Sequence, residues 1–171
     1  MGLYSNLIHY FTLQSRNLEE AVRFAREGLP ISNVIRSQGD LGPALLLLRN
    51  NAAFALIEAG FTDEAGAVLS QISPWVHKEP HPTATLGFFN LTKGHVSRGL
   101  ELYREAIRML PNGTAREEFT QKLNLELGKC YSRLNNAEKA RVYLSRAINK
   151  SGLAVIEAEA KRLLRALPFK P

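Results

Sequence analysis

The sequence of 171 residues contains a single cysteine, Cys130. One cysteine cannot form a disulfide within the chain, and a reducing compartment is the simpler assumption. Cys130 falls on an apolar helical stripe, which favours a packing role over a catalytic one. A chain of this length can bury a continuous core without disulfides or a structural metal.

Long hydrophobic runs are also missing. No segment approaches the roughly 18 consecutive apolar residues that a membrane-spanning helix needs, and the richest run, Ala44 to Leu48, is soon followed by Arg49. The N-terminus lacks the basic residues that would precede the apolar core of a secretion signal. We therefore expect a cytoplasmic protein.

The motifs of common enzyme classes are not found. The glycines are scattered and none forms a Gly-rich turn leading to Lys-Ser or Lys-Thr. The four histidines have no Ser or Cys partner at a spacing typical of nucleophilic catalysis. His77, Glu79 and His81 form a weak metal candidate, because Pro80 interrupts the helical turn that would align them. We expect no enzymatic activity, no metal and no cofactor.

The positive charge is unevenly distributed. Residues 1–97 carry seven Lys or Arg and eight Asp or Glu, whereas residues 98–171 carry fifteen and eight, so the net charges are −1 and +7. Such a basic half suits an acidic protein surface or nucleic acid, although a solvated helix face rich in lysine is more common.

What the sequence does contain is a repeated pattern of small and large apolar residues, which predicts three helical hairpins at about 43–76, 80–113 and 121–152. Small residues where two helices cross allow close backbone approach, and a large residue beside each crossing fills the remaining space. The small residues are Ala53, Gly87 and Gly128 in the first helices and Ala65, Gly99 and Ala140 in the second; the large ones are Leu69, Tyr103 and Leu144.

The spacing of the copies is not uniform. Ala53 and Gly87 are 34 residues apart, whereas Gly87 and Gly128 are 41 apart. We place the seven surplus residues in the polar stretch around Asn112 to Phe119. One hairpin cannot cover its own apolar face, so stacked neighbours must share a core.

The chain resembles a tetratricopeptide repeat protein, with three copies that cover about residues 43 to 152. In the third copy Leu127, Gly128 and Tyr131 follow the L-G-x2-Y spacing of that family, with Ala140 and Leu144 in the next helix, and Leu86 and Gly87 occupy the same places in the second copy. The chain departs from the family in lacking the early Trp in every copy and in placing Gly152 where the third copy would end with Pro. The resemblance implies an all-α fold, a right-handed superhelix of antiparallel helical hairpins. Residues 1–42 would form a divergent N-terminal hairpin or cap with a connector, and residues 153–171 a C-terminal capping helix and tail.

The resemblance also implies a concave groove lined by the first helix of each hairpin. The expected groove residues are Asn50, Asn51, Phe54, Ile57, Glu58, Thr85, Phe88, Leu91, Lys122, Leu125, Lys129 and Arg133. We predict a peptide or helix whose apolar side chains meet Phe54 and Phe88 and whose acidic end meets Lys129 and Arg133. The alternative is that a cap or a neighbouring subunit buries the two phenylalanines.

These features predict a protein-interaction scaffold or adaptor without catalysis, whose partner is a protein or peptide with an acidic segment. One alternative is association with nucleic acid through the basic half, although that half lacks interleaved aromatic residues. Another is a small chaperone of this family for secreted proteins, although such chaperones are usually acidic. Self-association into a homo-oligomer through the end faces of the array is a further option.

Overall fold

The computed structural model describes residues 2–36, 42–148 and 153–168, and these residues form an all-α protein. Nine α-helices are present in this part of the chain, and it includes no strand. The all-α fold class predicted from the sequence is therefore confirmed. No helix among the described residues has both the length and the apolar character that a membrane crossing requires.

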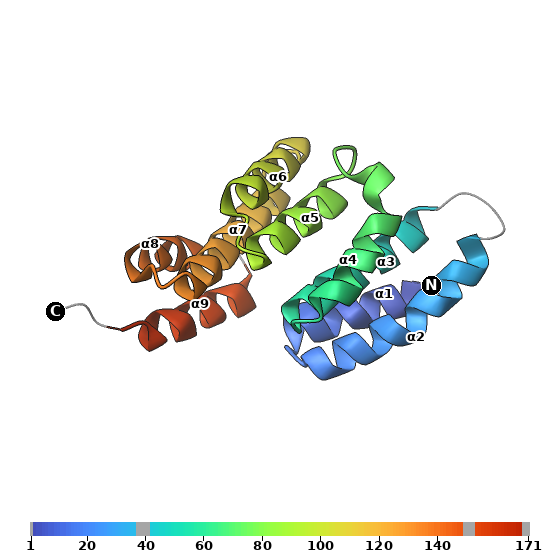
Figure 1. Cartoon of the computed structure of the whole chain (residues 1–171), viewed down its shortest axis with the longest axis horizontal. Coiled ribbons are helices and arrows are strands. Elements are labelled where there is room, and N and C mark those ends of the chain that lie inside the picture. The colour runs from blue at the N-terminus through green and yellow to red at the C-terminus, as the bar shows by residue number, and fades with distance from the viewer. Residues whose placement is uncertain (1, 37–41, 149–152, 169–171) are drawn as a thin grey trace.

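The helices follow one another as hairpins (Figure 1). In the first hairpin, α1 (Gly2–His9) continues into a π-helical turn (Tyr10–Gln14) and pairs with α2 (Leu18–Arg36). The later ones pair α3 (Pro43–Glu58) with α4 (Thr62–Gln71), α5 (Pro80–Thr92) with α6 (Val96–Met109), and α7 (Thr114–Arg133) with α8 (Ala137–Ala147). A 3-10 turn (Ser73–Trp75) precedes α5, and α9 (Ala154–Ala166) packs against α7 and α8.

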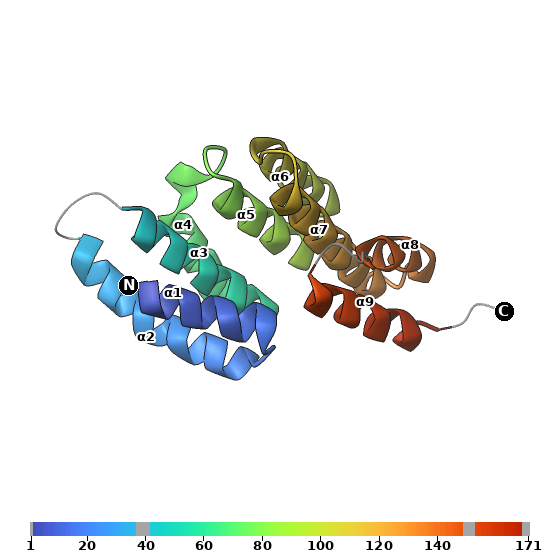
Figure 2. The ribbon, with the colours of Figure 1, turned by 180° about the vertical axis from the view of Figure 1, so that it is seen from behind.

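The first helices of successive hairpins are neighbours. Helix α3 contacts α1 on one side and α5 on the other, and α7 contacts α5 and α9. Viewed from behind, α1, α3, α5, α7 and α9 follow one another across the molecule (Figure 2). This row of helices forms one side of the array, and any site on that side must be built from residues far apart in sequence.

Small residues close the hairpin crossings. A Cβ atom added to Gly99 would lie only 2.8 Å from the carbonyl oxygen of Gly87 and 2.6 Å from Leu91 Cγ. In the next hairpin, a Cβ on Gly128 would lie 2.6 Å from Leu144 Cγ. The close approach predicted at these glycines is therefore confirmed.

The seven surplus residues of the third copy lengthen a helix. Helix α7 begins at Thr114, not near residue 121 as the repeat boundary predicted, because the polar stretch adds about two helical turns. Two side chains anchor these turns: Phe119 is buried in the main core, and the Arg116 guanidinium donates to the carbonyl oxygens of Ile107 (3.2 Å) and Leu110 (3.1 Å) at the end of α6.

The sequence also misplaces the end of α2. The connector predicted within residues 1–42 would begin at Pro30, because proline usually ends a helix at the preceding residue, yet α2 continues through Pro30 to Arg36. Proline disrupts a helix interior, but here the last turns of α2 pack on α3. Ser32 is fully buried, its hydroxyl donates to the Leu29 carbonyl oxygen (2.7 Å), and Arg49 Nε donates to the same hydroxyl (3.1 Å). The helix end predicted at Gly152 lies outside the described residues.

Candidate functional site

A cavity of about 290 Å³ opens on the side formed by the first helices. Each of the first four hairpins contributes its first helix to the wall, including the π-helical turn that follows α1. Most of the lining residues are apolar or uncharged polar residues, and they are Asn6, His9, Thr12, Leu13, Leu47, Asn50, Asn51, Phe54, His81, Ala84, Thr85, Tyr103, Phe119 and Lys122. The surface of the hollow is nevertheless more apolar than polar, and its volume lies near the lower end of the range typical of ligand sites.

Five of the residues predicted for the groove line this cavity: Asn50, Asn51, Phe54, Thr85 and Lys122. Three of them are fixed by hydrogen bonds. The Thr85 hydroxyl donates to Asn50 Oδ1 (2.8 Å) and so links α5 to α3, while Asn51 Nδ2 donates to Ser5 Oγ (3.0 Å) and so links α3 to α1. These bonds hold the polar part of the wall in place.

The structure places the other predicted apolar residues in the core. Ile57, Phe88 and Leu91 are buried in the cluster that joins the second, third and fourth hairpins. Leu125 is buried against α9, in the cluster that contains Ile156. The Phe54 and Phe88 rings lie 5.2 Å apart between centroids, and only Phe54 reaches the cavity, so a partner could meet one of the two rings but not both.

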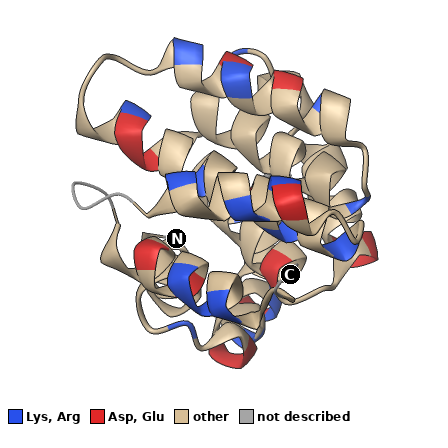
Figure 3. Cartoon of the chain, turned by 90° about the vertical axis from the view of Figure 1, so that its left-hand side faces the viewer, with Lys and Arg blue, Asp and Glu red and all other residues tan. Residues whose placement is uncertain are grey.

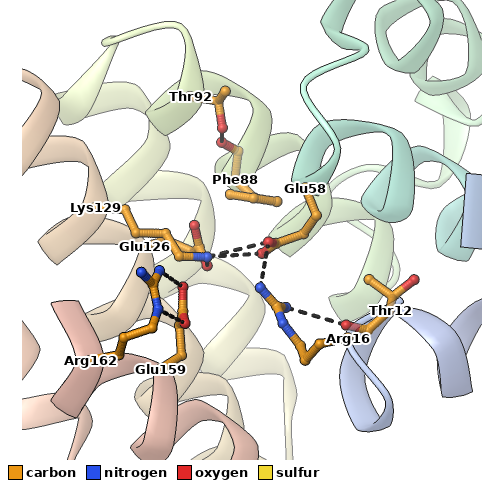
Figure 4. A network of polar contacts seen from close by, with 9 residues as sticks. All are labelled: Thr12, Arg16, Glu58, Phe88, Thr92, Glu126, Lys129, Glu159 and Arg162. Carbon is orange, nitrogen blue, oxygen red and sulfur yellow. Dashed lines mark hydrogen bonds and ion pairs between the residues drawn. The ribbon is translucent and has the colours of Figure 1, made fainter. Parts of the chain in front are cut away.

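The basic residues predicted at one end of the groove behave differently from one another. Arg133 is exposed at the last residue of α7. Lys129 is held inside the protein: its Nζ lies 3.2 Å from Glu58 Oε1 and 3.0 Å from Glu126 Oε1 (Figure 4). The side chains of Lys129, Glu58 and Glu126 are 15%, 6% and 4% exposed. The charge of Lys129 is thus already matched by carboxylates of the chain itself.

Arg16 extends this ion-pair cluster to the N-terminal hairpin. Its guanidinium lies 3.3 Å from Glu58 Oε2 and also donates to the Thr12 carbonyl oxygen (3.3 Å). Glu58 therefore receives cations from the first hairpin and from α7 at once. The cluster of Arg16, Glu58, Glu126 and Lys129, called here the ion-pair cluster, ties three hairpins together beside the cavity.

The pKa values within the ion-pair cluster follow from burial and neighbouring charge. Burial and the nearby Glu58 charge raise the pKa of Glu126 to about 7, although Lys129 acts against them. Burial acts in the same direction on Glu58, but the charges of Lys129 and Arg16 outweigh it and lower its pKa. Burial alone would lower the pKa of Lys129, but the two carboxylates raise it. Both glutamates thus pair with Lys129, but the pKa of Glu58 is lowered whereas that of Glu126 is raised.

Lys122 lies two turns before Lys129 on the same face of α7. Burial lowers its pKa, and its Nζ lies 5.6 Å from the centroid of the Phe119 ring. Among the residues that the structure describes, no carboxylate is close enough to form an ion pair with Lys122. The cavity therefore contains one cation that forms no ion pair with the carboxylates in the described part of the chain.

The histidines do not gather around a metal. His77 Nδ1 lies 2.8 Å from Glu105 on α6, whereas the His81 ring packs edge-on against Phe119 with centroids 5.2 Å apart. Within residues 2–36, 42–148 and 153–168, no three His, Cys, Asp or Glu side chains are placed to hold a metal ion.

The groove residues predicted from the sequence do not include the whole cavity wall. Asn6, His9, Thr12 and Leu13 come from the N-terminal hairpin, and Phe119 comes from the added turns of α7. The sequence could have indicated the residues of the N-terminal hairpin, because residues 1–42 have the outline of a hairpin whose first helix would lie beside the first helix of the next hairpin. The sequence could not have indicated Phe119, because the seven surplus residues lie outside the repeat pattern and their conformation does not follow from it.

Comparisons with protein-family models, with curated proteins and with solved structures give no match for this chain. Functional inference therefore rests on the geometry of the cavity and of the ion-pair cluster.

Proposed function

We propose that this protein is a helical-repeat scaffold or adaptor of the tetratricopeptide type, a right-handed superhelix that binds a peptide or helix of a partner protein in its concave groove. The observation that carries the proposal is the cavity lined by α1, α3, α5 and α7. A groove built from the first helix of every hairpin is the surface that stacked-hairpin proteins offer to extended partners.

The cavity also favours a particular kind of partner segment. Leu47 and Phe54 provide apolar surface on α3, and Lys122 provides an unmatched positive charge on α7. A segment with an apolar side chain followed by an acidic group would match both features. Because Lys129 already pairs with Glu58 and Glu126, we move the acidic contact from Lys129 to Lys122.

A groove variant with a matched control tests this function. Leu47 is 42% exposed on α3, and Val142 is 45% exposed on α8, away from the cavity. We expect Leu47→Asp to abolish capture of a specific protein from lysate and Val142→Asp to leave it unchanged, because both add the same charge at exposed positions. The captured protein's contact segment, prepared as a peptide, should bind the purified wild type and not the Leu47→Asp variant.

The same experiment separates this function from association with nucleic acid. On the basic half, Arg98 pairs with Glu101, Lys161 with Glu157 and Arg162 with Glu159, and Figure 3 shows acidic and basic residues intermingled on the helices. This mixing disfavours a continuous phosphate-binding face. Capture that disappears after nuclease treatment, or that Val142→Asp and Leu47→Asp weaken equally, would contradict the scaffold proposal.

A further inference from the structure

The cavity contains a charge that nothing in the described part of the chain balances. Lys122 is partly buried, and Glu118, one turn earlier, is near enough to raise its pKa but does not form an ion pair with it. The ring of Phe119 contacts the cation but carries no negative charge. A buried charge without a partner is costly, so an anion entering the cavity would relieve that cost.

Two histidines from other hairpins line the same cavity. His9 ends α1 and His81 lies in the first turn of α5. Burial and then the charge of Lys122 lower the pKa of each, which favours the neutral imidazole at neutral pH. A neutral imidazole still has one N–H to donate, so both side chains can add a hydrogen bond to an anion at Lys122.

The rest of the wall is uncharged. Phe54, Phe119 and Leu13 supply apolar surface. Asn50 Nδ2 reaches an acceptor among the described residues only at Asn51 Oδ1, 3.5 Å away, and this long contact leaves most of its donor capacity unused. The wall therefore combines one cation and several N–H donors with apolar surface, and none of its described residues carries a carboxylate.

We infer that this cavity binds a monocarboxylate attached to an apolar body, with the carboxylate at Lys122, His9 and His81 and the body against Phe54 and Phe119. The volume of about 290 Å³ accommodates roughly ten non-hydrogen atoms, at the roughly 30 Å³ that each water molecule occupies in the liquid. One carboxylate balances one lysine, whereas a dianion would leave excess charge near Glu118. The ligand is a free organic acid or the carboxylate of a peptide, and this inference does not depend on the scaffold function, because a free acid needs only the cavity.

Binding should also take up protons. Burial is the main cause of the lowered pKa of His9 and of His81, and the Lys122 charge adds to it. A carboxylate at Lys122 cancels this second contribution, so both pKa values rise in the complex. Glu118 near His9 and Glu79 near His81 already act in that direction, whereas the charge of His9 lowers the pKa of His81. By linkage, affinity increases as pH falls from 8 to 6.

The test is an NMR titration of the full chain with 3-phenylpropionate, followed through the imidazole signals of His9 and His81 and, in variants that lack these histidines, through backbone amide signals. Its neutral analogue, 3-phenylpropanamide, has the same apolar body without the charge. We expect saturable binding of the acid, binding of the amide weaker by about tenfold or more, and affinity for the acid higher by about threefold or more at pH 6 than at pH 8.

Variants separate the site from general charge effects. Lys122→Met should weaken binding of the acid by about tenfold or more, and Lys122→Arg should retain most of it. Lys78→Met removes the same charge at an exposed position outside the cavity and should leave binding unchanged. The double variant His9→Gln, His81→Gln should still bind but lose the difference between pH 6 and pH 8. Circular dichroism shows whether each variant is folded.

Peptides identify the source of the carboxylate. Tighter binding of a peptide ending in a free phenylalanine carboxylate than of its amidated form, and than of 3-phenylpropionate, would assign the site to a chain terminus. Tighter binding of an amidated peptide with internal Asp would assign it to a side chain, and tightest binding of the free acid to a small molecule. Equal binding of acid and amide, unchanged binding in Lys122→Met, or no saturation by any carboxylate at about 10 mM would overturn the inference.

Discussion

Helix α7 carries two lysines on one face, and their surroundings differ sharply. Lys129 lies within ion-pair distance of Glu58 and Glu126, whereas Lys122, two turns earlier, lines a cavity without a matching carboxylate among the described residues. Burial acts on both, but the pKa of Lys129 is raised and that of Lys122 is lowered. A lysine on this helix face thus forms ion pairs that link helices at position 129, whereas at position 122 it lines a cavity and forms no ion pair with the described residues.

The difference comes partly from α7 itself, where Lys129 pairs with Glu126, and partly from the second hairpin. Each lysine has a glutamate about one turn earlier, Glu126 before Lys129 and Glu118 before Lys122. Only Lys129 also faces Glu58, which comes from the last turn of α3. Lys129 is therefore neutralised within the fold by one carboxylate of its own helix and one from α3, whereas Lys122 has neither among the described residues and remains available for a ligand.

The largest effect should come from removing each lysine in turn. Lys129→Met leaves Glu58 and Glu126 buried with Arg16 as their remaining cation, so we expect the free energy of unfolding to fall by about 3 kcal/mol at pH 7. Lys122→Met removes an unpaired charge, so its free energy of unfolding should stay within about 1 kcal/mol of wild type or exceed it. Urea denaturation of both variants measures the difference. Equal losses in the two variants would remove the distinction between the lysines.

A substitution at a hairpin crossing tests whether the effects of the two lysine variants are independent of packing elsewhere in the array. In Gly99→Ala the new methyl group would meet the backbone of Gly87 and the side chain of Leu91, so we expect a loss of about 2 kcal/mol. Because the new methyl group would contact neither lysine, the loss of stability from Gly99→Ala should add to that from either lysine variant. Gly66→Ala is the matched control, since its Cβ would lie 3.5 Å from Phe89, and it should stabilise α4 by up to about 1 kcal/mol. Denaturation of the double variants would reveal any coupling.

The pH dependence of stability isolates the ion-pair cluster. The pKa of Glu126, about 7 in the folded protein, is above its ordinary value, so the folded state binds an extra proton between about pH 4.5 and 7. Its contribution to stability is therefore present at low pH and is lost as pH rises through 7. Glu126→Gln, which resembles the protonated acid, should match wild type near pH 5 and exceed its free energy of unfolding by about 1–2 kcal/mol at pH 8.

Other groups require a matched comparison in that experiment. The lowered pKa values of His9 and His81 give the opposite slope below about pH 6.5, because the unfolded chain then binds more protons. The difference between Glu126→Gln and wild type at each pH removes this contribution. Glu138→Gln, at an exposed position on α8, should follow the wild-type curve. A constant difference between Glu126→Gln and wild type from pH 5 to 8 would contradict the raised pKa.

The sequence predicted the hairpin crossings because small residues at a crossing impose a strong local constraint. Gly87, Gly99 and Gly128 lie where a side chain would overlap the opposite helix. Periodicity also predicted the all-α class. It could not place the start of α7, since the surplus residues follow no repeat and depend on the contacts of Arg116 and Phe119.

The sequence was less informative about the site. It identified Lys122, Phe54 and Asn50 as groove residues, and all three line the cavity. It also assigned Lys129 to a partner, because neither residue spacing nor charge reveals that Glu58 lies beside it from 71 positions away. Pairing between distant residues depends on how hairpins stack, and a charge pattern along one helix does not contain that information.

The smallest expected effect concerns Arg16, the second cation of Glu58. The Arg16 side chain is 30% exposed, so Arg16→Met should lower the free energy of unfolding by only about 0.5–1 kcal/mol, a value typical of partly exposed ion pairs. Arg23→Met is a suitable control, since Arg23 forms more exposed ion pairs within α2 with Glu20 and Glu27, and its effect should be smaller still.

The double variant Arg16→Met, Lys129→Met tests whether Arg16 and Lys129 act on the same carboxylates. With both cations removed, the ion-pair cluster retains two buried carboxylates and no positive charge, so the loss should exceed the sum of the single losses by about 0.5 kcal/mol or more. The same combination with Lys122→Met should be additive, because Lys122 does not pair with Glu58. A thermodynamic cycle from urea denaturation measures both couplings, and equal couplings would mean that Glu58 does not distinguish the two lysines.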